Sequence, residues 1–125
     1  SDSATALVLI DGEPTEIRSS IYGTHAVEAG EIQAALAEGG ESASKKESAI
    51  RNAFDGMFYQ LDRLCIARQH DLLTKDDISP ATIYYSRLMT TTHRFVLEYG
   101  RRNGYSRAAS FVEDLAALWS GPATK

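Results

Sequence analysis

A chain of 125 residues, 43% hydrophobic and 24% charged, is long enough to bury a core as one domain and too apolar to be disordered. Its net charge of −4 divides into −6 over residues 1–47 and +2 over residues 48–125, and neither part has the lysine and arginine density of a nucleic-acid-binding protein. One cysteine excludes an internal disulfide, and no apolar run approaches the ~20 residues that span a bilayer, so we expect a cytoplasmic chain without a membrane segment.

The first 23 residues are predicted to form a β-hairpin. Residues 7–10 are an apolar run of strand length, Asp11-Gly12 is a frequent hairpin turn, and residues 15–18 supply a second short strand. Two strands alone are marginally stable in water, so we expect this hairpin to pack on a helix or to pair with a second chain. Its exposed edge is therefore one candidate contact surface.

Residues 24–47 are predicted to hold a short helix and a linker. Thr24 suits the N-cap of this helix, Ile32 and Leu36 lie on one face of it, and a pair of glycines follows. Gly30, in the middle of the segment, would cost about 1 kcal/mol relative to alanine. The sequence GGESASKKES that follows has the small, polar and charged composition of a linker.

Residues 48–69 have the clearest helical pattern in the chain. Apolar residues recur there with the i, i+3, i+4, i+7 spacing of an amphipathic helix. They are Ile50, Ala53, Phe54, Met57, Phe58, Leu61, Leu64 and Cys65. The sequence HDLLTKDDISP is then expected to make a turn, in which Thr74 and Asp77 have the spacing and polarity of a capping box.

Two further helices are predicted, over residues 80–102 and 106–119. Pro80 suits the first position of the earlier helix, and Asn103-Gly104 is typical of its end. Short connections favour antiparallel neighbours, so residues 48–120 should form the core of an antiparallel bundle of three to four helices. We therefore predict one mainly α domain with a short N-terminal β-hairpin, completed within the chain or across a dimer.

Asp62, Cys65 and His70 have a spacing that raises the question of a catalytic or metal site. Five residues turn a helix through about 500°, so Cys65 and His70 point about 140° apart and cannot act together unless the helix breaks. Cys65 falls on the apolar face, where a free cysteine behaves as a small hydrophobe. His70 suits the helix end, and Asp62 should pair with a neighbouring arginine or face water.

Other signatures of chemistry do not occur in the sequence. The three histidines, His25, His70 and His93, are dispersed, and there is no Cys-x-x-Cys, His-Glu-x-x-His or calcium-loop motif. No nucleotide-binding loop or Gly-x-Ser-x-Gly elbow is found either. We therefore assign no catalytic, metal-binding or cofactor-binding residue, and we predict that the protein is not an enzyme.

Arginines supply one candidate interaction surface. They are Arg87, Arg94, Arg101, Arg102 and Arg107. The first three are spaced by seven residues and would share one face of the predicted helix 80–102. One interpretation is a solvated, salt-bridged face. The other is a cationic surface for an acidic partner, such as the N-terminal segment of a second copy with its charge of −6.

Two stretches of the chain carry a family resemblance. They are NAFDGMFYQLDRLCIARQHDLLTKDDI and HRFVLEYGRRNGYSRAASFVEDLAALW. With them, residues 50–119 resemble a family of uncharacterised bacterial helical domains that are often attached to a single membrane helix. Gln60 to Asp62 stand where that family has a glutamate after an aromatic pair. The resemblance implies a helical fold and no catalytic residues, and it leaves open a membrane anchor outside this chain. Within the chain itself we expect no signal peptide.

These features together predict a non-enzymatic interaction or assembly module that self-associates or binds a protein partner and needs no cofactor. The alternative is a small-molecule sensing or regulatory domain with a pocket between its helices. In that alternative, Tyr84, Tyr85 and Tyr99 would line the pocket together with the helix that carries Cys65.

Overall fold

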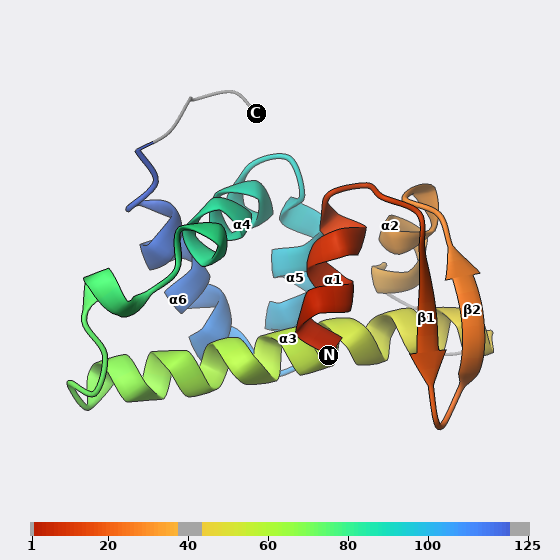
Figure 1. Cartoon of the computed structure of the whole chain (residues 1–125), viewed down its shortest axis with the longest axis horizontal. Coiled ribbons are helices and arrows are strands. Elements are labelled where there is room, and N and C mark those ends of the chain that lie inside the picture. Colours follow the sequence, from red (N-terminus) through yellow and green to blue (C-terminus); the bar gives the residue numbers. More distant parts are fainter. Residues whose placement is uncertain (1, 38–43, 121–125) are drawn as a thin grey trace.

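A computed structural model describes residues 2–37 and 44–120 (Figure 1). The elements in chain order are α1 (Asp2–Ile10), β1 (Thr15–Ser19), β2 (Gly23–Val27), α2 (Gly30–Leu36), α3 (Lys45–Gln69), the 3-10 turn η2 (Lys75–Asp77), α4 (Pro80–Thr90), α5 (Arg94–Arg102) and α6 (Ser106–Ala116). The described chain is mainly helical and has a two-stranded antiparallel sheet, so the prediction of a mainly α fold is confirmed.

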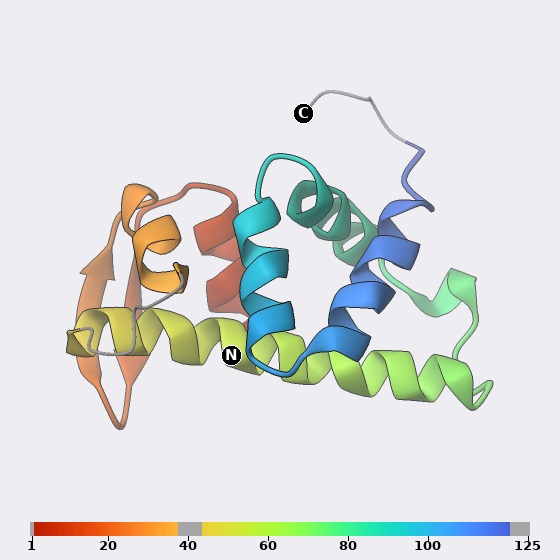
Figure 2. The ribbon, with the colours of Figure 1, turned by 180° about the vertical axis from the view of Figure 1, so that it is seen from behind.

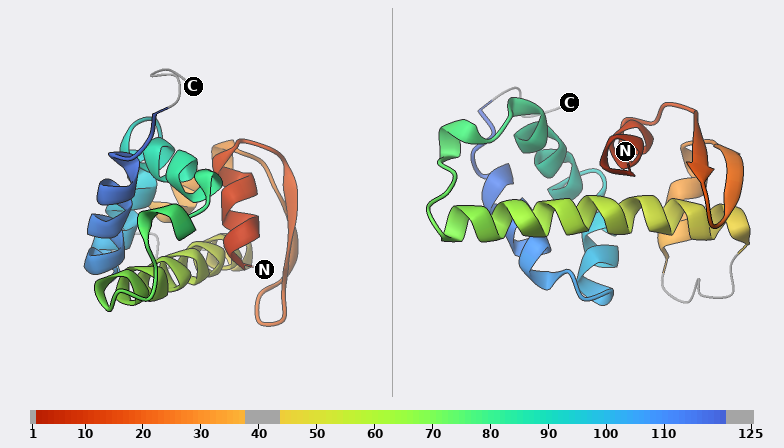
Figure 3. Two further views of the ribbon diagram at one scale, coloured as in Figure 1. Left: turned by 60° about the vertical axis from the view of Figure 1, so that its left-hand side comes forward. Right: turned by 60° about the horizontal axis from the view of Figure 1, so that its bottom comes forward.

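The long helix α3 supports the other elements along its length (Figures 1 and 2). The sheet and α2 lie over its N-terminal end, α1 and α5 over its middle, and α6 over its C-terminal half, with α4 against α6. In a view turned about the horizontal axis, α1 and α5 lie on opposite sides of α3 (Figure 3). The shorter helices cross α3 instead of running beside it, so an antiparallel bundle of three to four helices is not confirmed.

The helix predicted over residues 48–69 is confirmed as α3, which begins three residues earlier, at Lys45. Ser44 and Glu47 form a capping box, in which the Glu47 N–H donates to Ser44 Oγ at 3.2 Å and the Ser44 N–H donates to Glu47 Oε1 at 3.3 Å. The apolar face is buried as the spacing predicts, except that Leu64 is half-buried. His70 is the C-cap of the helix, and its N–H donates to the carbonyl of Ile66 at 3.1 Å.

The prediction of a strand at residues 7–10 is wrong, because these residues end helix α1. Ala6, Leu9 and Ile10 have helical spacing, are buried, and pack against α3. Gly12 has a φ of +84° and donates its N–H to the Leu9 carbonyl at 3.1 Å, so Asp11-Gly12 ends a helix instead of making a hairpin turn. A short apolar run fits either structure, and contact with α3 decides between them.

A β-hairpin does form, but it lies further along the chain. The strand predicted at residues 15–18 is confirmed as β1, and it pairs with β2 from Thr15↔Val27 to Ser19↔Gly23. The turn is held by Ser19 Oγ, which accepts the N–H groups of Ile21 and Tyr22, and Gly23 has a φ of +85°.

The helix predicted from Thr24 is therefore wrong over its first six residues, four of which belong to β2. Helix α2 begins only at Gly30. Gly30 therefore occupies the first position of the helix and not its middle, and glycine is better tolerated there than in a helix interior. Val27, the last residue of β2, is buried. The glycine pair at 39–40 and most of the predicted linker lie outside the described residues.

The helix predicted over residues 80–102 is two helices, α4 and α5. It begins as predicted, with Ser79 as N-cap and Pro80 in the first turn. Within it, the hydroxyls of Thr90 and Thr91 donate to the Arg87 carbonyl at 3.0 and 2.7 Å. Such side-chain hydrogen bonds compete with the backbone hydrogen bonds of the helix. Helix α4 accordingly ends at Thr90, and α5 begins at Arg94 with a different direction.

The predicted ends of the last two helices are met only in part. Gly104, with a φ of +88°, follows α5 as the sequence predicts. Helix α6 ends at Ala116, three residues earlier than predicted, and Leu118 and Trp119 are half-buried. The glycine and proline expected to close it lie outside the described residues.

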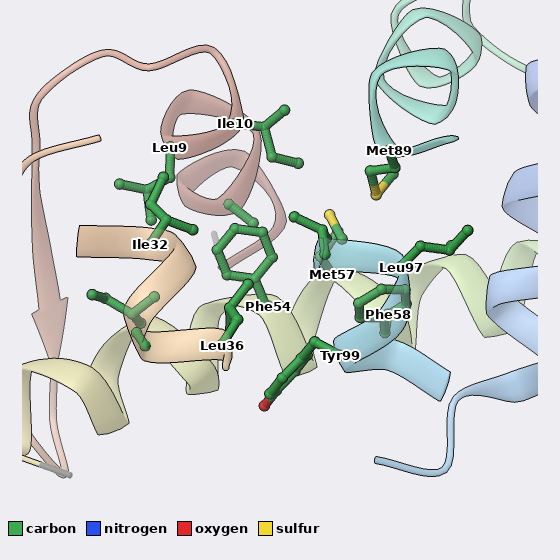
Figure 4. Packing of buried hydrophobic residues seen from close by; sticks show 14 of the residues in the cluster. Leu9, Ile10, Ile32, Leu36, Phe54, Met57, Phe58, Met89, Leu97 and Tyr99 are labelled. Carbon is green, nitrogen blue, oxygen red and sulfur yellow. The ribbon is translucent and has the colours of Figure 1, made fainter. Parts of the chain in front are cut away.

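The buried residues form two clusters along α3. The larger one, called the main core here, joins α3 to α1, α2 and α5 and contains Leu9, Ile32, Leu36, Phe54, Phe58, Leu97 and Tyr99 (Figure 4). The smaller one, called the second core, consists of Cys65, Ile78, Phe111 and Leu115, with Leu64, Ile83 and Leu118 packed against it. The candidate site lies beside the second core.

Candidate functional site

An open cleft of about 290 Å³ lies between the C-terminal half of α3 and helix α6. In Figure 2, α6 (blue) rises from the C-terminal half of α3. The residues that line it are Cys65, Arg68, Gln69, Phe111, Asp114 and Leu118. We call this the α3–α6 cleft.

Helical spacing explains why these six residues meet. Cys65, Arg68 and Gln69 are related as i, i+3 and i+4, so their side chains lie on one face of α3. Phe111 and Asp114 are three residues apart and share a face of α6, and Leu118 follows one turn later. Packing of α6 on α3 brings the two faces together across the cleft.

The cleft has an apolar floor and a polar rim. Cys65 and Phe111 are only 6% and 5% exposed and belong to the second core. Gln69 and Asp114 are exposed, and Arg68 is half-buried. This division places apolar atoms below and hydrogen-bonding groups above, which is the usual arrangement of a ligand site.

The thiol of Cys65 is held in its protonated form. Burial raises the pKa of this thiol, and the negative charges of Asp62 and Asp114 act in the same direction, against the positive charge of Arg107. A thiol with a raised pKa is a poor nucleophile at neutral pH. Cys65 therefore serves the cleft as an apolar surface, in line with the sequence interpretation.

Arg68 and Asp114 bring charges of opposite sign to the rim of the same cleft. Neither takes part in the ion pairs found within residues 2–37 and 44–120, which join Arg18 to Glu16, Lys46 to Glu31, Arg101 to Glu113 and Arg107 to Asp62. Both charges are thus available to a ligand in the cleft.

A second cavity, of about 120 Å³, opens between α1, α3 and α4. Its lining is mainly apolar and consists of Leu7, Met57, Gln60, Leu61, Leu64, Thr82, Tyr85 and Met89. The hydroxyl of Tyr85 donates to Asp11 Oδ2 at 2.5 Å, and this bond raises the pKa of Tyr85 to about 12. The small volume and mainly apolar walls favour a small apolar group.

The three tyrosines named in the alternative hypothesis have different surroundings. Tyr99 is buried, and its hydroxyl donates to Asp55 Oδ1 at 2.8 Å; burial and this bond raise its pKa. Tyr84 packs against Trp119, with ring centroids 5.4 Å apart, and Tyr85 lines the second cavity. Neither of the two cavities described above is lined by all three.

Asp62, Cys65 and His70 do not form a site together. Asp62 accepts hydrogen bonds from Arg107 Nε and Nη2 at 2.7 and 2.8 Å, which lower the pKa of its carboxyl. Its partner is thus an arginine, as predicted, but one on α6 and not a neighbour on α3. His70 is exposed at the end of α3. Within the described residues, no group of three or more histidine, cysteine, aspartate or glutamate side chains could hold a metal ion.

The predicted arginine surface is divided between elements. Because the helix breaks, Arg87 lies on α4 and Arg94 on α5, so the spacing of seven does not create one continuous face. Arg101 pairs with Glu113 at 2.6 Å, and Arg102 donates to the Leu36 carbonyl at 2.6 Å. With Arg107 bound to Asp62, these side chains hold helices of the same chain together, and their role as an interaction surface stays a prediction.

Sequence reasoning did not find Arg68, Gln69 or Asp114. A signal was present, because these polar residues continue the helical faces that carry Cys65 and Phe111. Only the packing of α6 on α3, between residues distant in sequence, shows that the two faces enclose a cleft.

No family model matches this chain, and no curated protein or solved structure matches it. The resemblance to uncharacterised helical domains therefore stays a prediction. No helix within the described part of the chain has the length and apolar character needed to cross a membrane.

Proposed function

We propose that this chain is a non-enzymatic small-molecule-binding domain, of a sensing or regulatory kind, whose ligand occupies the α3–α6 cleft. The observation that carries the proposal is an apolar floor beneath two opposite charges that are not used in the ion pairs of the described residues. The volume of about 290 Å³ is near the lower end of the ~300–1,000 Å³ of small-molecule sites.

The chemistry of the lining favours binding over catalysis. The cleft offers a guanidinium, a carboxylate and an amide as groups that can orient a ligand. Its thiol has a raised pKa, which keeps it protonated. A ligand that contacts both α3 and α6 would stabilise the folded chain in proportion to its concentration and affinity.

A thermal-shift screen against small metabolites tests this proposal. We expect at least one compound to raise the unfolding temperature in a concentration-dependent manner, and the double variant Arg68→Ala/Asp114→Ala to lose this response. A control variant, Arg63→Ala/Glu98→Ala, removes two exposed charges outside the cleft and should respond as the wild type does. A response that survives the cleft variant, or no response to any compound, would contradict the proposal.

Self-association through β2 is a second candidate function. In Figure 1, β2 lies on the side of the sheet away from α1, and the described sheet has only these two strands. Exposed sheet edges pair readily with further strands. The strand reads Gly-Thr-His-Ala-Val, without acids, lysine or arginine, so a second copy could pair with it without repulsion between such charges.

Light scattering at micromolar concentration tests the second candidate. We expect a dimer that the double variant Thr24→Lys/Ala26→Lys converts to a monomer, because lysines on an edge strand oppose pairing. Ser110→Lys, an exposed change on α6, is the matched control and should leave the dimer intact. A monomeric wild type would rule this candidate out without affecting the cleft.

A further inference from the structure

The charges at the rim of the α3–α6 cleft define the kind of ligand it would hold. We propose that this ligand is a small zwitterion with an apolar side chain, of the class of α-amino acids with an aliphatic or aromatic side chain. The inference rests on the proposed function, since it names the ligand of the same cleft. It follows from three properties of the lining: charge, hydrogen-bonding groups and shape.

The two charges in the lining favour a ligand that carries both a negative and a positive charge. Arg68 can bind a carboxylate through two parallel N–H···O bonds, and Asp114 can accept hydrogen bonds from an ammonium group. A ligand with only a negative charge would meet Asp114 unpaired, and one with only a positive charge would meet Arg68. In each case the ligand's charge would lie near a side-chain charge of the same sign, and such repulsion is how charged sites reject a wrong ligand.

The floor of the cleft accounts for the apolar part of the ligand. Cys65, Phe111 and Leu118 present thiol, ring and aliphatic surface at the bottom of the cleft, and the first two are almost completely buried. An apolar side chain placed there would displace water from this surface, which is favourable by about 25 cal/mol per Å². Glycine has the same two charges but no side chain, so we expect it to bind much more weakly.

The single thiol of the chain offers a direct measure of occupancy. Cys65 is the only cysteine and lines the cleft, so its rate of reaction with methyl methanethiosulfonate reports whether the cleft is filled. The rate can be followed by intact-mass spectrometry at a fixed pH of about 7, at which the α-amino group of an amino-acid amide, with a pKa of about 8, is still mostly protonated. We expect leucine, methionine or phenylalanine to slow the reaction in a concentration-dependent manner.

Analogues that lack one charge test the zwitterion itself. N-acetyl-leucine keeps only the carboxylate, and leucine amide keeps only the ammonium group. We expect each to bind at least about tenfold more weakly than leucine, which corresponds to the loss of ~1.4 kcal/mol of interaction. Glycine, which tests the apolar floor, should give little protection of Cys65.

Two conservative variants assign the charges to residues. Asp114→Asn should weaken leucine binding while leaving N-acetyl-leucine unchanged or improved, and Arg68→Gln should have the mirror effect with leucine amide. The matched controls are Glu98→Gln and Arg63→Gln, which remove exposed charges outside the cleft. Circular dichroism and the unfolding temperature of each variant establish that it is folded.

The outcomes separate this inference from the proposed function. If singly charged or neutral compounds protect Cys65 as well as leucine does, or if only such compounds do, the zwitterion inference is wrong while the cleft remains a ligand site. If no compound of the metabolite set protects Cys65 or raises the unfolding temperature, both the inference and the proposed function are wrong. Protection by leucine that disappears in the charge variants alone supports both.

Discussion

Two parts of α3 take part in two different kinds of packing. The part up to Leu61 contributes Phe54 and Phe58 to the main core, where both rings are completely buried. The last two turns contribute Cys65 to the second core, which has four buried residues, and a cleft opens beside it. One continuous helix thus has a closely packed end and an incompletely packed end, and the candidate binding site occurs where side chains leave space.

Close packing in the main core is most visible where α5 crosses α3. A Cβ atom on Gly100 would lie 2.6 Å from Cζ of Phe58, so only a residue without a side chain lets the helices approach this far. The ring of Phe58 also stacks on Tyr105, with centroids 5.4 Å apart. The second core has no comparable constraint on the side of Phe111 that faces the cleft.

The same substitution in the two cores gives the largest expected difference. Phe58→Ala should lower the free energy of unfolding by about 3–5 kcal/mol, because it leaves a closed cavity in the main core. Phe111→Ala should cost less, about 2 kcal/mol, because its ring borders an open cleft that water can enter. Urea unfolding measures both values, and equal losses would show that the two cores are packed equally well.

A methyl group on Gly100 tests the close approach of α5 to α3. Gly100→Ala should cost about 1–3 kcal/mol, because the added Cβ overlaps the ring of Phe58. Gly30→Ala is the matched control: nothing lies within 4 Å of the added Cβ there, so its stability should stay the same or rise by up to about 1 kcal/mol. If Gly100→Ala left the free energy of unfolding unchanged, the side chains of the main core could rearrange as easily as those of the second core.

The hydrogen bond from Tyr85 to Asp11 joins α4 to the residue that follows α1, beside the main core. The folded chain raises the pKa of Tyr85 from 10.0 to about 12, so this bond stabilises the fold below pH 10 and its contribution is lost as the pH rises through 12. Tyr85→Phe should cost about 1 kcal/mol at neutral pH and reduce the loss of stability between these pH values.

Unfolding in urea over this pH range measures the effect of Tyr85→Phe. Tyr59→Phe, on the exposed face of α3, is the control that should keep the pH dependence of the wild type. If Tyr85→Phe left the alkaline loss of stability unchanged, the hydrogen bond to Asp11 would contribute nothing to it.

The ion pair between Arg107 and Asp62 should have the smallest effect. It holds α6 to α3 near the cleft through two hydrogen bonds, but 53% of the Arg107 side chain is exposed. Asp62→Asn should therefore cost about 0.2–1 kcal/mol, and less at high salt. A double-mutant cycle with Arg107→Gln measures the pair, and a coupling well above this range would mean that the second core depends on it.

Local signals were sufficient for several parts of the fold. The capping box of Thr74 and Asp77 forms as predicted, with the Thr74 N–H donating to Asp77 Oδ2 at 2.7 Å. Pro80 begins α4 and Gly104 follows α5, because these residues restrict or permit particular backbone angles wherever they occur. Such features depend on residues within one or two turns of each other.

Other parts depended on neighbours that are distant in sequence. Residues 7–10 are apolar at every position, so no period distinguishes a strand from a helix, and only their contact with α3 selects the helix. The segment from Thr24 has alternatives of similar local quality, and pairing with β1 selects the strand. These choices are tertiary, and the sequence pattern alone could not make them.

The sequence by itself determined that this protein is a mainly helical domain built on one long amphipathic helix, because a buried stripe with helical spacing extends over about five turns of α3, from Ala49 to Cys65. It also determined that Cys65 lies on the apolar face and His70 at the exit, since helical geometry separates them. Only the tertiary structure decided that Cys65, Arg68, Phe111 and Asp114 enclose a cleft. The physical reason is that a cleft is a property of two surfaces, and each helix encodes only its own.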